Sequence, residues 1–285
     1  MKIGIHNFFS FRKIDYIIIN NLIQKNIFIE SFKNTEIYDL VIDNNKEQTN
    51  FFEILKTILQ RFNISEKMNI LKNLFVGVDC FVINCGPSSA NLTNEDLKYI
   101  KENFCVFSVK YYLLKLLEND IIPDVQFNSV YLNPKNPDIE YYLEKSSKSI
   151  STCIYWNQDF IENNLDKKYQ CDIPFVPDRI NSWHEKTFDE IKNANNLDIF
   201  NFELHKNIGV YFKLGNIMIE TVIPFALHCG IKNIYTSGWD LNNLNANKAL
   251  SEGLYDDKTT KSNCCELNCL TYLNKLFLNN DVHLY

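Results

Sequence analysis

The sequence is poor in the residues that bend a chain, with only 8 glycines and 7 prolines among 285 residues. It contains neither the glycine-rich dinucleotide fingerprint nor the phosphate-binding loop that ends in Gly-Lys-Ser/Thr, so the two best-known nucleotide motifs are absent. No apolar run reaches 18 residues, and we therefore expect no membrane-spanning helix. Positive charge is not in excess either, because the net charge is −6. That balance argues against nucleic acid as the main partner.

A pattern of metal-binding cysteines is also lacking. Nine cysteines are scattered along the chain, and Cys264, Cys265 and Cys269 form a close group without a second ligand pair. We therefore predict no metal and no cofactor. An odd number of cysteines, with no recognisable signal peptide, favours a reducing compartment. The expected location is cytoplasmic, with peripheral association with a membrane left open.

From residue 77 onward, predicted strands and helices alternate regularly along the chain. Hydrophobic residues make up 46% of the sequence, which is typical of a folded domain with a core. Strands are predicted at residues 80–83, 105–109, 125–128, 152–156, 199–203 and 233–236, and helices at 94–101, 111–118, 217–229 and 265–278. Such alternation predicts an α/β fold with a Rossmann-like, doubly wound, mostly parallel sheet.

The first 76 residues are predicted to form an N-terminal α/β extension, followed by a Rossmann-like domain over residues 77–285. Strands are expected at 2–5 and 38–42, helices at 13–24 and 50–62, and a polar connection at 65–72. Within the second domain, residues 160–195 contain Pro174 and Pro177 and have the least regular pattern. We interpret that stretch as an excursion over the edge of the sheet that would serve as a lid.

Residues 80–90 are the most informative stretch. An apolar strand runs directly into the turn Asn84-Cys85-Gly86-Pro87-Ser88, and a helix capped by Thr93 follows. A glycine in such a turn lets a ligand approach the backbone, and amide groups near the start of a helix favour phosphate. This stretch therefore predicts a nucleotide site.

Polar residues follow other predicted strands as well. Asn128 ends the strand at 125–128, and Ser237, Gly238, Trp239 and Asp240 follow the strand at 233–236. Gly215 and Asn216 stand immediately before the apolar helix at 217–229, in which Pro224 predicts an irregularity. Because ligands of doubly wound sheets bind at the carboxyl ends of the strands, we expect these residues to gather at one edge.

The order of these motifs resembles that of the bacterial sialyltransferases of glycosyltransferase family forty-two. It also resembles a related domain of unknown function that includes an archaeal pterin diphosphokinase. The likeness covers roughly residues 78–285 and rests on Gly-Pro-Ser, Phe-Asn, a glycine-initiated helix and Thr-Ser-Gly-Trp-Asp. It implies a Rossmann-like sheet of a GT-A-like variant. The implied activity is metal-independent transfer of an acid sugar, sialic-acid-like or Kdo-like, from a CMP-sugar donor to a surface glycan in capsule or lipopolysaccharide biosynthesis.

The resemblance also implies which residues would bind the donor. They are Asn84, Cys85, Gly86, Pro87, Ser88, Lys110, Asn128, Gly215, Asn216, Ser237, Gly238, Trp239 and Asp240. Two positions depart from the family, which has asparagine where this chain has Cys85 and Lys110. A lysine at the second position would meet a phosphate or carboxylate as a point charge.

The catalytic base of those sialyltransferases is a histidine in the loop before the last helix, and residues 242–263 contain none here. Deprotonation of an acceptor hydroxyl requires a base. Asp256 and Asp257 are candidate substitutes in the loop, and His184 and His205 are candidates elsewhere.

Two other functions stay open at this point. A pterin-type diphosphokinase would transfer diphosphate from ATP to a pterin alcohol and would need magnesium, with Asp124 and Asp240 as candidate ligands. A catalytically degenerate nucleotide-binding module would instead act as a partner in a larger biosynthetic complex. The chain would then be a fragment, an expectation raised by its strand-like ending at residues 282–285.

Overall fold

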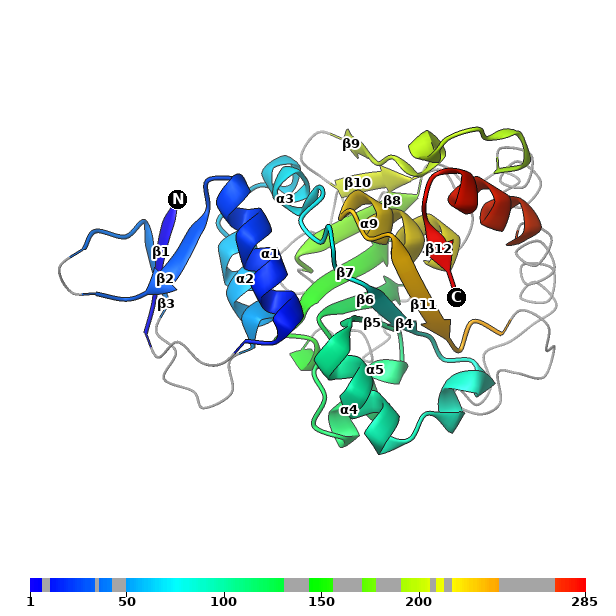
Figure 1. Cartoon of the computed structure of the whole chain (residues 1–285), viewed down its shortest axis with the longest axis horizontal. Helices are drawn as coiled ribbons and strands as arrows, with labels where there is room; N and C mark the ends of the chain where they lie inside the picture. Colours follow the sequence, from blue (N-terminus) through cyan, green and yellow to red (C-terminus); the bar gives the residue numbers. More distant parts are fainter. Residues whose placement is uncertain are drawn as a thin grey trace.

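A nine-stranded sheet forms the centre of the computed structural model (Figure 1). The structure describes residues 1–6, 11–33, 36–42, 50–130, 144–155, 171–177, 191–205, 209–212, 217–240 and 270–285. In order across the sheet, the strands are β12 (His283–Leu284), β11 (Asn233–Ser237), β4 (Cys80–Ile83), β5 (Cys105–Val109), β6 (Val125–Val130), β7 (Ile150–Tyr155), β8 (Ile173–Pro177), β10 (Gly209–Phe212) and β9 (Glu203–His205).

All neighbouring strands of this sheet are parallel except β10 and β9. Alternate residues of the central strands enter two apolar clusters, one on each face. Ile83 and Val106 pack with α4 (Asn94–Asn103) and α5 (Tyr112–Glu118) on one face, whereas Val82 and Phe107 belong to the larger cluster on the other. Helices on both faces of a mostly parallel sheet confirm the predicted α/β, Rossmann-like, doubly wound fold.

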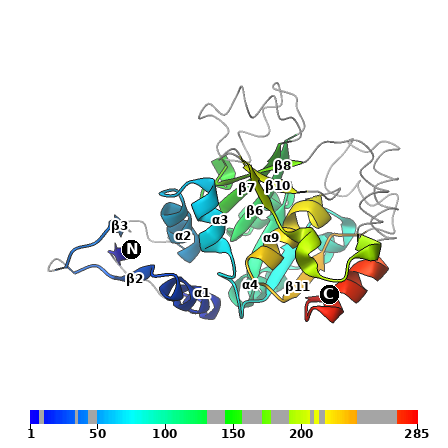
Figure 2. The ribbon, with the colours of Figure 1, turned by 90° about the horizontal axis from the view of Figure 1, so that it is seen from above.

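The N-terminal residues form a second, three-stranded parallel sheet in the order β2 (Phe28–Ser31), β1 (Lys2–Ile5) and β3 (Leu40–Ile42). Helices α1 (Lys13–Gln24), α2 (Phe51–Leu59) and α3 (Ile64–Leu71) lie between this small sheet and the large one (Figure 2). Ile18 and Leu55 from these helices share one apolar cluster with Phe127 of the large sheet. The N-terminal helices therefore cover part of one face of the large sheet.

Helix α3 replaces the polar connection expected at residues 65–72, so that prediction is wrong. Asn63 caps the helix by accepting a hydrogen bond from Glu66 N, and the Glu66 carboxylate accepts from Asn63 N in return. Met68 and Leu71 bury the apolar side of the helix. A capping box with a short apolar stripe is enough to form a helix when a neighbouring layer covers the stripe.

On the far side of the sheet, the strand predicted at residues 199–203 is misplaced, and residues 173–177 of the stretch interpreted as a lid form a strand. Most of that stretch, and with it the lid itself, lies outside the described residues. Residues 197–200 form a 3₁₀ turn capped by Asn196, and the strand begins only at Glu203. Within the stretch interpreted as a lid, β8 pairs with both β7 and β10. Prolines usually exclude an inner strand. Ile173 and Phe175 are nevertheless completely buried, and this burial holds the strand in the sheet.

The helix predicted over residues 217–229 is present but irregular, as Pro224 indicated. A π-helical turn (Ile217–Val222) precedes α9 (Ile223–His228), and Pro224, which has no N–H, lies just after the junction. The helix ends at Gly230, whose φ is +85°, and Ile231 N donates to Ala226 O. This glycine-terminated end was also predicted.

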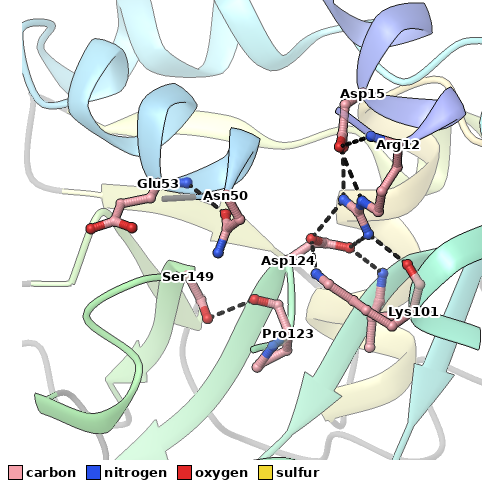
Figure 3. A network of polar contacts seen from close by, with 9 residues as sticks. Arg12, Asp15, Asn50, Glu53, Lys101, Pro123, Asp124 and Ser149 are labelled. Carbon is pink, nitrogen blue, oxygen red and sulfur yellow. Dashed lines mark hydrogen bonds and ion pairs between the residues drawn. The ribbon is translucent and has the colours of Figure 1, made fainter. Parts of the chain in front are cut away.

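A buried ionic cluster ties the N-terminal layer to the large sheet (Figure 3). Asp124, immediately before β6, is fully buried and accepts hydrogen bonds from both terminal nitrogens of Arg12 at 3.0 and 3.1 Å. Its other partners are Lys101 Nζ and the backbone N–H of Val106. Arg12 also pairs with Asp15 at 2.7 Å. Burial alone would raise the pKa of Asp124, but the charges of Arg12 and Lys101 lower it below its ordinary value.

Asp172 repeats this arrangement two strands away, immediately before β8. Its carboxylate accepts from the backbone N–H and the hydroxyl of Ser151 at 2.8 and 2.9 Å, and Lys56 of α2 lies 3.1 Å from it. Each of the two buried carboxylates therefore lies at the amino edge of the large sheet and forms an ion pair with a side chain of the N-terminal layer.

We expect Asp124→Asn to destabilise the fold by about 3–5 kcal/mol, because removing one member of a buried ionic cluster leaves its cations uncompensated. Urea denaturation at pH 7 measures this loss. Asp281→Asn, at a carboxylate that is 86% exposed, is the control and should leave the midpoint unchanged. Equal midpoints for both variants would contradict the role assigned to the cluster.

Wild type and Asp124→Asn should also differ in how their stability changes with acid. Because the folded-state pKa of Asp124 lies below its ordinary value of 3.8, its stabilising contribution is present above that value. The contribution is lost as the pH falls through the lower folded-state pKa. The stability gap between wild type and Asp124→Asn should therefore be constant from pH 7 to about pH 5 and narrow below about pH 4, as measured by urea midpoints at each pH.

Candidate functional site

The turns that follow β4 and β11 are bonded to each other at the carboxyl edge of the large sheet. Asn84 N donates to Ser237 O at 2.8 Å, and Gly86 N donates to Gly238 O at 2.9 Å. These bonds continue the ladder of the two parallel strands beyond the last strand residues, Ile83 and Ser237. The two turns therefore form one rigid unit.

Side chains complete this contact in both directions. Ser88 N donates to Asp240 Oδ2 at 2.8 Å, and Gly238 N donates to Ser88 Oγ at 2.7 Å. Asp240 thus caps the short 3₁₀ helix η1 (Pro87–Asn91) from another part of the chain. The structure brings together Asn84, Gly86, Ser88, Ser237, Gly238 and Asp240, all of which were predicted site residues.

Close approach of the two backbones explains both glycines. A Cβ atom on Gly86 would lie 2.4 Å from Gly238 O and 2.5 Å from Asp240 Oδ2. A Cβ atom on Gly238 would lie 2.1 Å from Asn84 O, and the φ angle of Gly238 is +79°. What approaches Gly86 in this structure is therefore the neighbouring turn, at a distance that no side chain permits.

The junction of β4 and β11 is also the topological switch point of the sheet. After β4 the chain crosses the face that α4 covers, through Leu97 and Ile100. After β11, residues 270–279 are helical and place Leu273 and Phe277 in the cluster on the opposite face. Ligands of open α/β sheets bind at the carboxyl edge where connections diverge in this way.

Lys110 and Asn128 lie at the same edge, on the next two strands. Lys110 follows β5 with a φ of +52°, and its N–H donates to Phe127 O at 2.8 Å. Gln126 Nε2 lies within hydrogen-bond distance of Lys110 O and of Asn128 Oδ1, at 3.2 and 3.1 Å. An amide pair on β6 therefore adjoins the end of β5.

Cys85 is held inside this edge as a neutral thiol. Its Sγ donates to Val109 O at 3.2 Å. Burial raises the pKa of Cys85, and the charge of Lys110 opposes that rise only in part. A thiol in such surroundings is not a reactive nucleophile.

The other predicted site residues are placed as follows. Pro87 begins η1, and Trp239 packs partly buried against the larger apolar cluster. His205 ends β9, whose antiparallel pairing with β10 puts that end at the opposite edge of the sheet. The structure therefore does not bring His205 to the β4 and β11 turns. His184, Gly215, Asn216, Asp256 and Asp257 lie outside the described residues.

Asp124 is not available as the magnesium ligand considered above. Asp124 precedes β6 at the amino edge of the sheet, and its charge is already paired with Arg12 and Lys101. Asp240, by contrast, follows β11 at the carboxyl edge. Across the part of the chain that the structure describes, no three His, Cys, Asp or Glu side chains are grouped as a metal site. Of the two candidate ligands, Asp240 is therefore the one that lies at the carboxyl edge.

Two polar residues of the central strands, Ser108 and Gln126, were not among the predicted site residues. Both are completely buried. The sequence does contain an indication of the buried amide pair. In the pattern Gln126-Phe127-Asn128, two amides lie on one face of a strand in the middle of the sheet.

The structure is that of an α/β protein in which most of the predicted site residues lie at the switch point of a doubly wound sheet. A family model described as 6-hydroxymethylpterin diphosphokinase MptE-like matches residues 49–246. The match covers well over half of the chain and includes both turns, so the chain belongs to this family. It begins in the N-terminal layer, ahead of α2, and not near residue 78. A search of curated proteins finds no match.

This family overturns the expectation of a sialyltransferase. Assignment to glycosyltransferase family forty-two, transfer from a CMP-sugar donor, and a nucleotide sugar and a surface glycan as partners are all wrong, and a role in capsule or lipopolysaccharide synthesis loses its basis. The physical reason lies in the motifs themselves. Gly86, Ser88, Gly238 and Asp240, which belong to these motifs, hold the two turns together, so the motifs are explained by the fold and do not identify the donor. The pterin diphosphokinase, the alternative reading, is the better supported one.

One further observation concerns membranes. Among the helices that the structure describes, none combines the length and the apolar character needed to cross a bilayer.

We expect Gly238→Ala to destabilise the protein more than Gly77→Ala. Both glycines have φ near +80°, so each alanine adds backbone strain of about 1–2 kcal/mol. The new Cβ at position 77 meets nothing closer than Ile17 Cγ2 at 3.7 Å, whereas at position 238 it meets Asn84 O at 2.1 Å. The difference between the two urea midpoints measures the steric part, and equal losses would contradict the close contact of the turns.

Proposed function

We propose that this protein is a diphosphokinase of the pterin type, which transfers diphosphate from a nucleoside triphosphate to the hydroxymethyl group of a pterin. Membership of the MptE-like family supports the reaction class. The observation that carries the proposal is the pair of bonded turns at the switch point, where Gly86 N to Gly238 O at 2.9 Å and Ser88 N to Asp240 Oδ2 at 2.8 Å fix the polar edge.

The proposed reaction is a displacement at the β-phosphorus of the triphosphate. The hydroxymethyl oxygen forms a new bond to that phosphorus, and the bond from the β-phosphorus to the oxygen that bridges to the α-phosphorus breaks. The nucleoside monophosphate leaves with that oxygen, the hydroxyl proton passes to solvent, and the pterin keeps the β- and γ-phosphates. Catalysis of phosphoryl transfer depends mainly on positioning and on compensation of charge.

Ser88 and Lys110 are the residues we assign to the phosphates. Ser88 Oγ accepts from Gly238 N, which leaves its own hydrogen to be donated to a phosphate oxygen. Lys110 is half-buried at the end of the neighbouring strand, near enough to Cys85 to oppose the rise of the thiol pKa. Its ammonium group would offset negative charge on the transferred diphosphate.

Asp240 acts through Ser88 in this proposal. Its carboxylate holds the Ser88 amide and so fixes the turn that presents the hydroxyl. It is therefore a positioning residue.

We also infer a cytoplasmic location. In the part of the chain that the structure describes, Cys80, Cys85, Cys105 and Cys229 form no disulfide, which supports a reducing compartment.

We expect the purified chain, given 6-hydroxymethylpterin and ATP with Mg²⁺, to form AMP and a pterin diphosphate ester in equal amounts. Phosphorus NMR follows both products. Asp240→Ala should lower kcat/KM by about ten-fold or more, because a hydrogen bond to a charged group contributes about 1.5–3 kcal/mol. The matched control is Thr236→Val on β11, whose hydroxyl bonds Tyr285 O away from the turns and should not matter.

Two results would contradict this function. One is formation of free phosphate or diphosphate without a phosphorylated pterin. The other is pterin phosphorylation that Asp240→Ala and Thr236→Val affect equally.

A further inference from the structure

Three buried polar atoms without hydrogen-bond partners lie on β5 and β6. They are Ser108 Oγ, Gln126 Oε1 and Asn128 Nδ2. Ser108 stands opposite Gln126 in the register of the two strands, and Asn128 follows two residues later, so all three side chains belong to the same face. Ser108 and Gln126 are completely buried, and Asn128 is 4% exposed.

The orientations of the two amides are fixed by their surroundings. Gln126 Nε2 lies 3.2 Å from Lys110 O, 3.2 Å from Phe127 O and 3.1 Å from Asn128 Oδ1. The two backbone carbonyl oxygens, Lys110 O and Phe127 O, require the nitrogen of the glutamine amide at that position. Asn128 must then turn its oxygen toward Gln126. The pair is left with an unpaired acceptor, Gln126 Oε1, and an unpaired donor, Asn128 Nδ2.

Such an arrangement is costly unless another molecule completes it. A buried polar group without a partner costs about 1–3 kcal/mol, and nearly all such groups in native proteins are paired. Here a donor, an acceptor and a hydroxyl are unpaired together on one face of two adjacent strands. Thr152 also has an unpaired hydroxyl, but it stands opposite Phe127 and so belongs to the other face of the sheet.

The amide pair lies at the carboxyl edge, beside the proposed phosphate site. Gln126 reaches Lys110 O, which belongs to the first residue after β5. The strand that carries the pair, β6, is two strands from β4. Two strand spacings of about 4.8 Å make a separation of about 10 Å between the pair and the Gly86 turn. A ring bound at β6 would therefore lie beside phosphates bound at the turn.

We propose that Gln126 and Asn128 recognise the polar edge of the pterin ring through hydrogen bonds, an inference that rests on the proposed function. That edge has an amino group, a ring N–H and a carbonyl oxygen in a row. The ring N–H would donate to Gln126 Oε1, and Asn128 Nδ2 would donate to the carbonyl oxygen. The Ser108 hydroxyl, which both donates and accepts, would meet the amino group.

The count of unpaired groups favours a pterin over adenine. Three protein groups match an edge with three polar groups, whereas the corresponding edge of adenine has only an amino group and a ring nitrogen. Guanine shares the three-group edge, so GTP is a necessary arm of the test. Gln126 and Asn128 are specificity residues in this proposal, and they take no part in the chemical step.

The test compares ligand binding by wild type and Asn128→Leu. The fluorescence of 6-hydroxymethylpterin reports its affinity, and calorimetry reports the affinities for ATP and GTP with Mg²⁺. We expect Asn128→Leu to weaken pterin binding about ten-fold or more, because its removal leaves a buried carbonyl of the ligand unpaired. The affinity for ATP should stay unchanged. Thr152→Val, which removes an unpaired hydroxyl from the other face, is the matched control and should bind the pterin like wild type.

Asn128→Asp is the second variant, in case leucine disturbs the fold. It keeps an oxygen toward Gln126 and replaces only the outward donor, so it should lose pterin affinity as well. Unchanged pterin affinity in both variants, or a loss confined to ATP or GTP, overturns the assignment while the proposed function stands. A wild-type chain that binds ATP but no pterin overturns the proposed function itself.

Discussion

The contact between Gly86 N and Gly238 O, at 2.9 Å, is the constraint on which the polar edge depends. It joins two turns that are about 150 positions apart, and it allows no side chain at either glycine. This close approach of the backbones places Ser88 and Asp240 at the same edge of the sheet, where they are hydrogen-bonded to each other. The short motifs at these turns therefore follow from geometry first. The ligand contacts that we propose come from Ser88 and from residues outside the two turns, namely Lys110, Gln126 and Asn128.

Local signals predicted much of the fold. The bounds of β4, β5 and α1 agree with their predicted ranges, because apolar runs and charged flanks define them without help from distant residues. β8 and α3 were missed because their stability comes from burial against other layers. The local sequence argued against both elements, since Pro174 and Pro177 are unfavourable in a strand and polar residues interrupt the apolar stripe of the helix. Tertiary packing outweighs local preference in both elements.

The positions of the turn residues were predicted better than the function. Most of the predicted turn residues do meet at one edge, because parallel strands force their carboxyl ends together. Substrate class could not be deduced from Gly-Pro-Ser or Ser-Gly-Trp-Asp, which the loop contact demands whatever the ligand. The unpaired atoms of Ser108, Gln126 and Asn128 became visible only when every partner of every buried group was known.

Asp124 and Asp172 have a consequence for the order of folding. Asp124 is 112 positions from Arg12. Asp172 is 112 positions from Gln60, whose side-chain amide donates to it at 3.3 Å, so both anchors of the N-terminal layer are made late in synthesis. The early helices can complete their packing against the large sheet only after β6 and β8 have been synthesised. Pairings this distant in sequence slow the search for the native state. We therefore expect the N-terminal layer to reach its final packing late in folding.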